Sequence, residues 1–283
     1  MTGGNISMID RIRSFLRSTG LASRLSPLLA KVEDVRLRQY GDLVQRSLTD
    51  ETSELISAAG DGYRLGPPKH YAEMVVSRHE LPTLVACANV FAPVVKNGVV
   101  WDVGGNAGFY SALLSQMAGA GRHVYAFEPV PATFQRMCEN LNLAGAVGVI
   151  PMNLALSDKD GILPISFDPA SDTTSSLEKT SGASCVEVRV AAGDSLVESG
   201  ECLPPTALKM DIEGHELKAL AGMKKLLARP ECRAVLCEVH FAILAAGGEQ
   251  QAGARARGML AEAGFDRITF ISRSHLMATK GRF

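Results

Sequence analysis

The segment at residues 99–108, VVWDVGGNAG, joins an apolar, β-branched run to an acid and a group of glycines. Its chemically distinctive positions are Asp102, Gly104, Gly105, Asn106 and Gly108. Glycine lacks a Cβ and adopts positive φ without strain, so the main chain can come close to a ligand there. Open α/β sheets bind nucleotide-like ligands at such turns between a strand and a helix. The segment therefore predicts a ligand-binding turn, with tight strand-to-helix packing as the alternative.

The glycine spacing distinguishes two classes of cofactor. A dinucleotide fold requires G-x-G-x-x-G, which sets a helix N-terminus against a pyrophosphate. Counted from Gly104 the pattern meets Asn106, and counted from Gly105 it meets Ala107, so this fingerprint fails in both registers. An acid before the turn and an amide inside it suit a ligand with an ammonium, a carboxylate and a sulfonium but no phosphate. That ligand is S-adenosylmethionine.

A single acid follows the next apolar run, which covers residues 123–127. Glu128 lies 20 positions after Gly108. An acid at about this distance, at the end of the second strand, accepts hydrogen bonds from ribose hydroxyls. We expect Glu128 to bind the ribose of the cofactor, with capping of the helix near Pro131 as the alternative.

A second set of ionisable residues follows two later apolar runs. It comprises Asp211, Glu213, His215 and Glu216 after residues 206–210, and Glu238 and His240 after residues 234–237. If both runs are parallel strands, their carboxyl ends meet at the edge of the sheet where ligands bind. Acids also favour the start of a helix because of the helix dipole, which explains Glu216 but not the whole run.

A histidine at this edge could accept a proton from an attacking hydroxyl group. We expect His215 or His240 to be that base, with Asp211 and Glu238 as orienting partners. His215 is preferred because it lies inside the acidic run. Asp211 could instead hold the ammonium group of the methionine moiety.

Three segments, residues 102–111, 125–143 and 208–223, resemble the FkbM-type methyltransferases. These Rossmann-like enzymes mostly O-methylate sugars, polyketides and other small natural products. The resemblance covers roughly residues 80–271, with one departure at Gly105, where the family more often has alanine. It implies S-adenosylmethionine as cofactor and a small-molecule acceptor with a hydroxyl group. It also implies that Ala155 and Leu156, after the third strand, lie against the adenine, and we add Phe109 and Pro129 to the expected cofactor site.

The apolar patterns predict an α/β fold with a mostly parallel seven-stranded sheet and flanking helices. The resemblance implies that this fold is of the Rossmann-like class I methyltransferase type. Helices are predicted at 80–93, 109–117, 131–142 and 251–263, and strands at 123–127, 147–151, 162–167, 186–190, 206–210, 234–237, 267–271 and 275–279. A loop or short hairpin at 49–68 separates this domain, residues 66–283, from a helical extension at 1–65. The serine- and threonine-rich loop at 171–184 is expected to cover the substrate mouth.

The N-terminal extension is basic and has apolar residues at helical spacing. We expect it to pack on its own domain or on a second subunit. In the second case, the N-terminal helices would make the protein a homo-oligomer. A helix lying on a membrane surface is the alternative. The longest apolar run, residues 81–95, is interrupted by Pro82, Asn89 and Pro93, so no transmembrane segment is expected.

The formal net charge of −1 disfavours a nucleic-acid substrate, since phosphate-binding surfaces are usually basic. The six cysteines are scattered without metal-ligand spacing, so we expect no metal site and reduced thiols in the cytoplasm. Two other classes of function remain as alternatives. A nucleotide-binding oxidoreductase is disfavoured by the glycine spacing, and a non-catalytic scaffold is disfavoured by the intact Asp102, Glu128 and Asp211. The acceptor stays open among sugar, polyketide, lipid and peptide hydroxyls.

Overall fold

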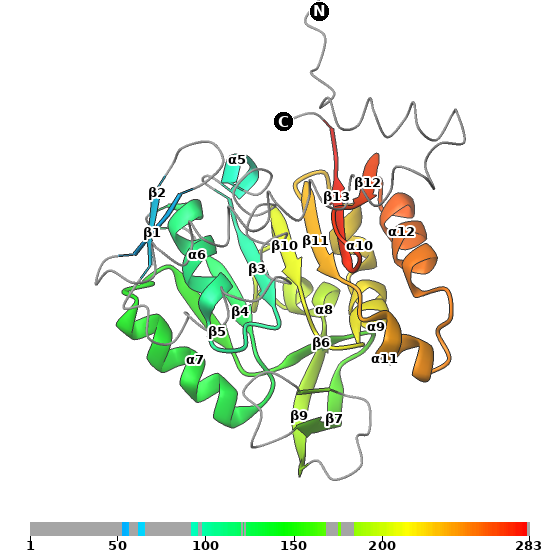
Figure 1. The fold of residues 1–283 in the computed structure, drawn as a ribbon, viewed down its shortest axis with the longest axis horizontal. Coiled ribbons are helices and arrows are strands. Elements are labelled where there is room, and N and C mark those ends of the chain that lie inside the picture. Colours follow the sequence, from blue (N-terminus) through cyan, green and yellow to red (C-terminus); the bar gives the residue numbers. More distant parts are fainter. Residues whose placement is uncertain are drawn as a thin grey trace, which may run out of the picture.

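A seven-stranded sheet forms the centre of the molecule (Figure 1). The computed structural model describes residues 53–56, 62–65, 92–95, 98–119, 121, 123–167, 175–176 and 184–281. The strand order is β12-β13-β11-β10-β3-β4-β5. The bounds are β3 Val100–Val103, β4 Val124–Phe127, β5 Val149–Met152, β10 Ala207–Met210, β11 Ala234–Glu238, β12 Arg267–Phe270 and β13 His275–Thr279. Neighbouring strands from β5 to β11 are parallel, whereas β13 is antiparallel to both β11 and β12. The expected α/β class with a mostly parallel seven-stranded sheet is confirmed.

The central strands are apolar because helices cover both faces of the sheet. Every residue of β3, β4 and β10 is buried. A parallel sheet covered on both faces has such continuously apolar strands. Trp101 is fully buried, packs against Phe127 at a ring-centroid distance of 5.1 Å, and donates a hydrogen bond from Nε1 to the carbonyl of Leu203 (3.0 Å).

One or two helices follow most strands of the central sheet, whereas β12 leads directly into β13. Their bounds are α5 Ala92–Val95, α6 Phe109–Ala118, α7 Pro131–Leu143, α8 Gly193–Glu198, α9 Glu216–Ala221, α10 Lys224–Ala228, α11 Phe241–Ala246 and α12 Ala252–Glu262. One apolar cluster contains Trp101, Leu208 and Leu260, and a second contains Phe109, Leu113 and Leu236. No helix in the described part of the chain is long and apolar enough to cross a membrane.

A second, smaller sheet extends below the central one in Figure 1. It has the order β6-β9-β7-β8, with β6 Ala155–Ser157, β7 Gly161–Phe167, β8 Ser175–Ser176 and β9 Ser184–Ala192. β7 and β9 are antiparallel, which confirms the pair expected at 162–167 and 186–190. A separate hairpin of β1 Ser53–Ile56 and β2 Gly62–Leu65 confirms the hairpin alternative for 49–68.

Candidate active site

The turn after β3 has the main-chain geometry that its glycines predict. Gly104, Asn106 and Gly108 have φ values of 89°, 44° and 91°. The N–H groups of Gly104 and Gly105 both donate to the carbonyl of Phe127, at 3.0 and 2.9 Å, which ties the turn to the end of β4. A Cβ on Gly104 would overlap the carbonyl oxygen of Asp211, so the turn also lies directly against the end of β10.

Glu128 is held against this turn by two main-chain hydrogen bonds. Its Oε2 accepts from the N–H of Asn106 (3.1 Å), and its Oε1 accepts from the N–H of Val130 (3.0 Å). Burial is the main cause that raises the pKa of Glu128 to about 7, against the lowering effect of these hydrogen bonds. A carboxylate offers about four acceptor positions, so Glu128 keeps capacity for ligand hydroxyls.

Asp102 has a different environment from the one expected. Its side chain is fully buried below the turn, where it accepts a hydrogen bond from Ser111 Oγ (2.6 Å) and lies 3.5 Å from Lys209 Nζ. Burial has the largest effect on the pKa of Asp102 and raises it, whereas the charge of Lys209 opposes this shift. These contacts support the turn from inside rather than presenting a carboxylate to a ligand.

Lys209 connects the turn with the acidic residues that follow β10. Its Nζ lies 3.5 Å from Asp102 and 3.7 Å from Asp211 Oδ2, and 4.5 Å from the centre of the Tyr110 ring. The side chain is almost entirely buried. Lys209 belongs to none of the residues expected at the site from the sequence, although a lysine within the otherwise apolar strand Ala207–Met210 is a signal that could have identified it.

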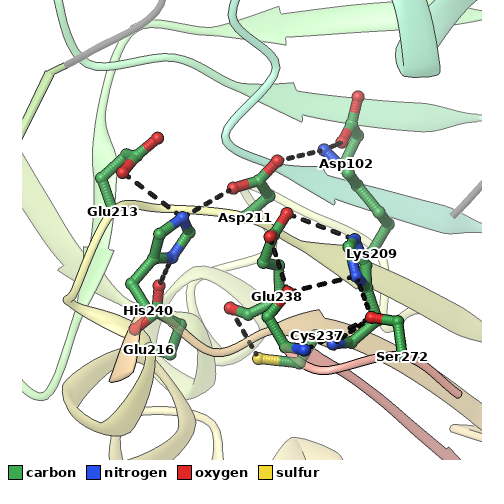
Figure 2. Close-up of polar contacts among 11 residues, drawn as sticks. Asp102, Lys209, Asp211, Glu213, Glu216, Cys237, Glu238, His240 and Ser272 are labelled. Atoms are coloured by element: carbon green, nitrogen blue, oxygen red, sulfur yellow. Dashed lines mark hydrogen bonds and ion pairs between the residues drawn. The ribbon is translucent and has the colours of Figure 1, made fainter. Parts of the chain in front are cut away.

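His240 lies at the centre of the acidic group, as Figure 2 shows. Its Nε2 lies 3.3 Å from Glu213 Oε2 and 3.7 Å from Asp211 Oδ1. Its Nδ1 lies 2.6 Å from Glu216 Oε1. The main chain brings the residues together from two strand ends, because Asp211 follows β10 and His240 follows β11.

The charges around His240 shift the pKa values of His240 and Glu213. Burial alone would lower the pKa of His240, but the hydrogen bond to Glu216 and the charges of Glu216, Glu213 and Asp211 raise it to about 9. Burial and the neighbouring carboxylates raise the pKa of Glu213 to about 7. Glu213 also has a positive φ of 49°, a backbone strain that often accompanies functional sites.

Asp211, Glu213 and His240 bring their side-chain N and O atoms within 4.8 Å of one another, a group that could also hold a metal ion. No metal site was expected from the sequence, because these residues are not at a recognisable spacing in the chain. The direct contacts of 3.3 and 3.7 Å show that the imidazole itself already bridges the two carboxylates.

Glu238, at the end of β11, is fixed by the turn before β13. Its Oε1 accepts from Ser274 Oγ (2.9 Å), and its Oε2 lies 3.2 Å from His275 Nε2. Burial would raise the pKa of Glu238, but the hydrogen bonds from His275 and Ser274 and the charge of His275 lower it to about 2. Glu238 is therefore a stable anion beside the cluster rather than a proton acceptor.

His215 lies apart from the group around His240. It is buried, and its Nε2 lies 3.0 Å from Ser157 Oγ in the smaller sheet. Burial, with a contribution from Lys218, lowers the pKa of His215 to about 4. The structure thus brings His240, Asp211 and Glu238 to one edge but turns His215 toward a different neighbour.

A family comparison decides what kind of protein carries this site. The family model described as the Methyltransferase FkbM domain matches residues 102–267, which include the glycine turn, Glu128 and the cluster around His240. The chain belongs to the FkbM methyltransferase family. The sheet order with an antiparallel β13 is accordingly the Rossmann-like class I methyltransferase fold expected from the sequence.

Two curated relatives align with parts of this FkbM chain. The hexuronic acid methyltransferase AglP of Haloferax volcanii is 38% identical over 148 residues, 52% of this chain and 58% of that protein. Methyltransferase 1 of Beauveria bassiana is 28% identical over 152 residues, 47% of this chain and 61% of that protein. The aligned region thus spans about three fifths of each relative's length. Among solved structures, methyltransferase FkbM from Methylobacillus flagellatus KT aligns with a TM-score of 0.44 and 13% identity, covering 88% of this chain and 60% of that one.

The remaining cofactor residues expected in this FkbM chain differ in accessibility. Phe109 and Leu156 are buried to about 1% exposure and pack in the two apolar clusters. Ala155 is buried in β6, and the carbonyl of Pro129 accepts a hydrogen bond from Asn153 Nδ2 (3.0 Å). Contacts from Phe109 and Leu156 to a ligand would therefore come mainly from their main chain.

Proposed function

We propose that this chain transfers a methyl group from S-adenosylmethionine to a hydroxyl oxygen of a small-molecule acceptor. The proposal rests on one observation, the contact of Lys209 with both Asp102 under the glycine turn (3.5 Å) and Asp211 in the histidine cluster (3.7 Å). A cofactor seated on the turn would therefore have its reactive end beside His240. Membership of the FkbM family supports the same reaction.

The residues divide between cofactor and acceptor in this proposal. Glu128 accepts hydrogen bonds from the ribose hydroxyls, and the main chain of Gly104–Gly108 approaches the methionine end. When bound, S-adenosylmethionine supplies an activated methyl group whose C–S electron pair returns to sulfur as the acceptor oxygen bonds to carbon. Because the pKa of His240 is about 9, the neutral form of its imidazole grows as the pH rises toward 9, and Nε2 of this form accepts the hydroxyl proton of the acceptor. This assistance is needed because an unassisted alcohol is a weak nucleophile. This choice reverses the preference for His215, whose Nε2 is occupied by Ser157.

The acceptor class follows from the charges at this edge. Asp211, Glu213 and Glu238 are partly exposed carboxylates, which favour a neutral hydroxyl over an anionic group as the reacting centre. The name of the Haloferax relative refers to a hexuronic acid, which supports a carbohydrate with several hydroxyl groups. Incubation with methyl-labelled cofactor and a panel of neutral glycosides and hexuronic acid glycosides tests this. Label in an ether is expected, and label in a methyl ester would contradict a hydroxyl acceptor.

The Glu128→Ala substitution should weaken binding of S-adenosylhomocysteine by ~1–3 kcal/mol, because charge-assisted hydrogen bonds to the ribose are lost. Calorimetric titration measures this affinity. Since burial places the pKa of Glu128 at about 7, its carboxylate becomes ionised as the pH rises through 7, and wild-type affinity should be higher at pH 8 than at pH 6. This pH dependence should disappear in the variant.

The matched control is Glu139→Ala, which removes an exposed carboxylate from α7. It should leave the affinity unchanged. A folded Glu128→Ala protein with wild-type affinity would contradict the ribose assignment. Titration with NAD separates the proposal from the oxidoreductase alternative, because only the oxidoreductase predicts that NAD binds and S-adenosylhomocysteine does not.

A further inference from the structure

Glu216 is buried more completely than a residue at the start of a helix needs to be. It is the first residue of α9, yet its exposed fraction is 0%. A carboxylate that serves only the helix dipole can remain in water, whereas a buried one is costly unless partners compensate for its lost hydration. A favourable interaction with the helix dipole therefore does not account for the position of Glu216.

The contacts of Glu216 are directed at the loop before α9 and at His240. Its Oε1 accepts from the N–H of Gly214 (3.0 Å) and lies 2.6 Å from His240 Nδ1. Its Oε2 is buried and has no hydrogen-bond partner among the described residues. An ionised carboxylate only accepts hydrogen bonds, so the short contact with His240 requires the proton to be on Nδ1. When the imidazole is neutral, above its pKa of about 9, that tautomer leaves Nε2 as the proton acceptor.

We propose that Glu216 is the positioning residue of the catalytic base: it fixes the ring of His240 and its Nδ1–H tautomer, so that Nε2 faces the acceptor hydroxyl. This inference rests on the proposed function. In the step itself, the O–H bond of the acceptor breaks, its proton moves to Nε2, and the oxygen electron pair forms the bond to the methyl carbon. The resulting imidazolium is stabilised by Glu216 and returns its proton to solvent.

The two sides of the ring differ in the way that this role requires. On the Nδ1 side lies Glu216, fully buried, whereas the carboxylates near Nε2, Asp211 and Glu213, are about one quarter exposed. Glu238 is the further charged group that interacts with His240. The Nε2 side is therefore the more exposed of the two, and an acceptor hydroxyl would reach Nε2 between Asp211 and Glu213. A histidine oriented by a carboxylate on its other nitrogen is a recurrent arrangement for a general base.

The test uses nitrogen-15 NMR of the full chain labelled at histidine, without cofactor or acceptor. The signals of His240 are assigned by their loss in His240→Gln. Wild-type His240 should titrate near pH 9 and be neutral as the Nδ1–H tautomer above that pH, because the surrounding carboxylates favour its charged form. In Glu216→Gln the midpoint should fall by ~1–3 pH units, since one adjacent negative charge is removed. In Glu216→Ala the Nδ1–H tautomer should also lose its excess over Nε2–H.

Controls and contrary outcomes separate this inference from simpler ones. Glu262→Gln, the same substitution at an exposed position of α12, should leave the titration unchanged. A purely structural Glu216 would lower the melting temperature of its variants without moving the midpoint or the tautomer, which would overturn the inference. Displacement of the His240 signals by Mg²⁺ or Mn²⁺ alone at millimolar concentration would also overturn it, because Nε2 would then be a metal ligand. Failure of the proposed function is distinct, since it would appear as the absence of labelled methyl ether from the wild-type protein, whereas the NMR measurement uses neither cofactor nor acceptor.

Discussion

The His240→Gln variant should transfer the methyl group ~10²–10⁴-fold more slowly than the wild type while binding the cofactor normally. Glutamine is close in size to histidine but does not accept a proton. Because the pKa of His240 is about 9, the wild-type rate should rise with pH toward 9, and this rise should be absent in the variant. The side chain that it replaces is only 17% exposed and contacts three carboxylates, so the variant should also lose some thermal stability, because these carboxylates lose their positive partner. Single-turnover methylation of a glycoside that the wild type accepts measures the rate, and calorimetry with S-adenosylhomocysteine measures the affinity.

His215→Gln is the matched control for this prediction. His215 contacts Ser157 in the smaller sheet, and its pKa of about 4 keeps it neutral at physiological pH. We expect it to retain methyl transfer within a few-fold of the wild type and to lose some thermal stability. The assignment of the base is contradicted if His215→Gln is the slow variant, or if both variants react at the wild-type rate. In the latter case, positioning of the hydroxyl alone carries the reaction.

The Gly104→Ala substitution should reduce the free energy of unfolding by ~2–5 kcal/mol and abolish cofactor binding. Two effects combine. Alanine is strained at a φ of 89°, which costs ~1–2 kcal/mol. Its Cβ would also overlap the main chain of Asp211, and this overpacking costs ~1–3 kcal/mol. The overlapping atom belongs to the backbone, so no side-chain rotation relieves it. The strands β3 and β10 would have to separate where the proposed cofactor and acceptor sites meet.

Gly119 provides the control, since it has nearly the same φ, 88°, and an added Cβ there would meet no atom of the described chain within 4 Å beyond its immediate neighbours. With ψ at 169°, this residue lies in a backbone region that is used essentially by glycine alone, so Gly119→Ala should cost ~1–3 kcal/mol of backbone strain and leave cofactor binding intact. Urea unfolding of both variants measures the difference. Equal destabilisation by the two substitutions would show that the contact between Gly104 and Asp211 is not a tight one.

The features predicted correctly from the sequence are local ones. The glycine turn and Glu128 follow their strands directly, so spacing along the chain was enough to place them at one edge. His215 and His240 follow strands in the same way, and sequence alone could not show which one faces that edge. The decision depends on α9, which packs against β6 and so turns His215 toward Ser157. The burial of Lys209 between Asp102 and Asp211 is likewise a tertiary effect.

Other expectations concern parts of the chain that lie outside the described residues. These are the amphipathic helices within residues 1–52, the self-association assigned to them, and most of the helix at 80–93 and the loop at 171–184. The domain boundary near residue 66, the reduced state of the cysteines in a cytoplasm and the exclusion of nucleic acid remain predictions. Low net charge supports the last of these only indirectly, because a local basic patch can exist on a neutral protein.

The contact between His275 and Glu238 implies an order in which the two binding sites can form while the chain is being synthesised. The glycine turn and Glu128 are translated well before β13, which lies between β11 and β12 in the finished sheet. Until Ser274 and His275 leave the ribosome, Glu238 lacks the two side chains that hold it in place, and β11 has a neighbour on one side only, β10. In a nascent chain, the residues proposed to bind the methyl donor are therefore synthesised before the acceptor side of the site is complete. The last strand of the sheet completes the reacting centre.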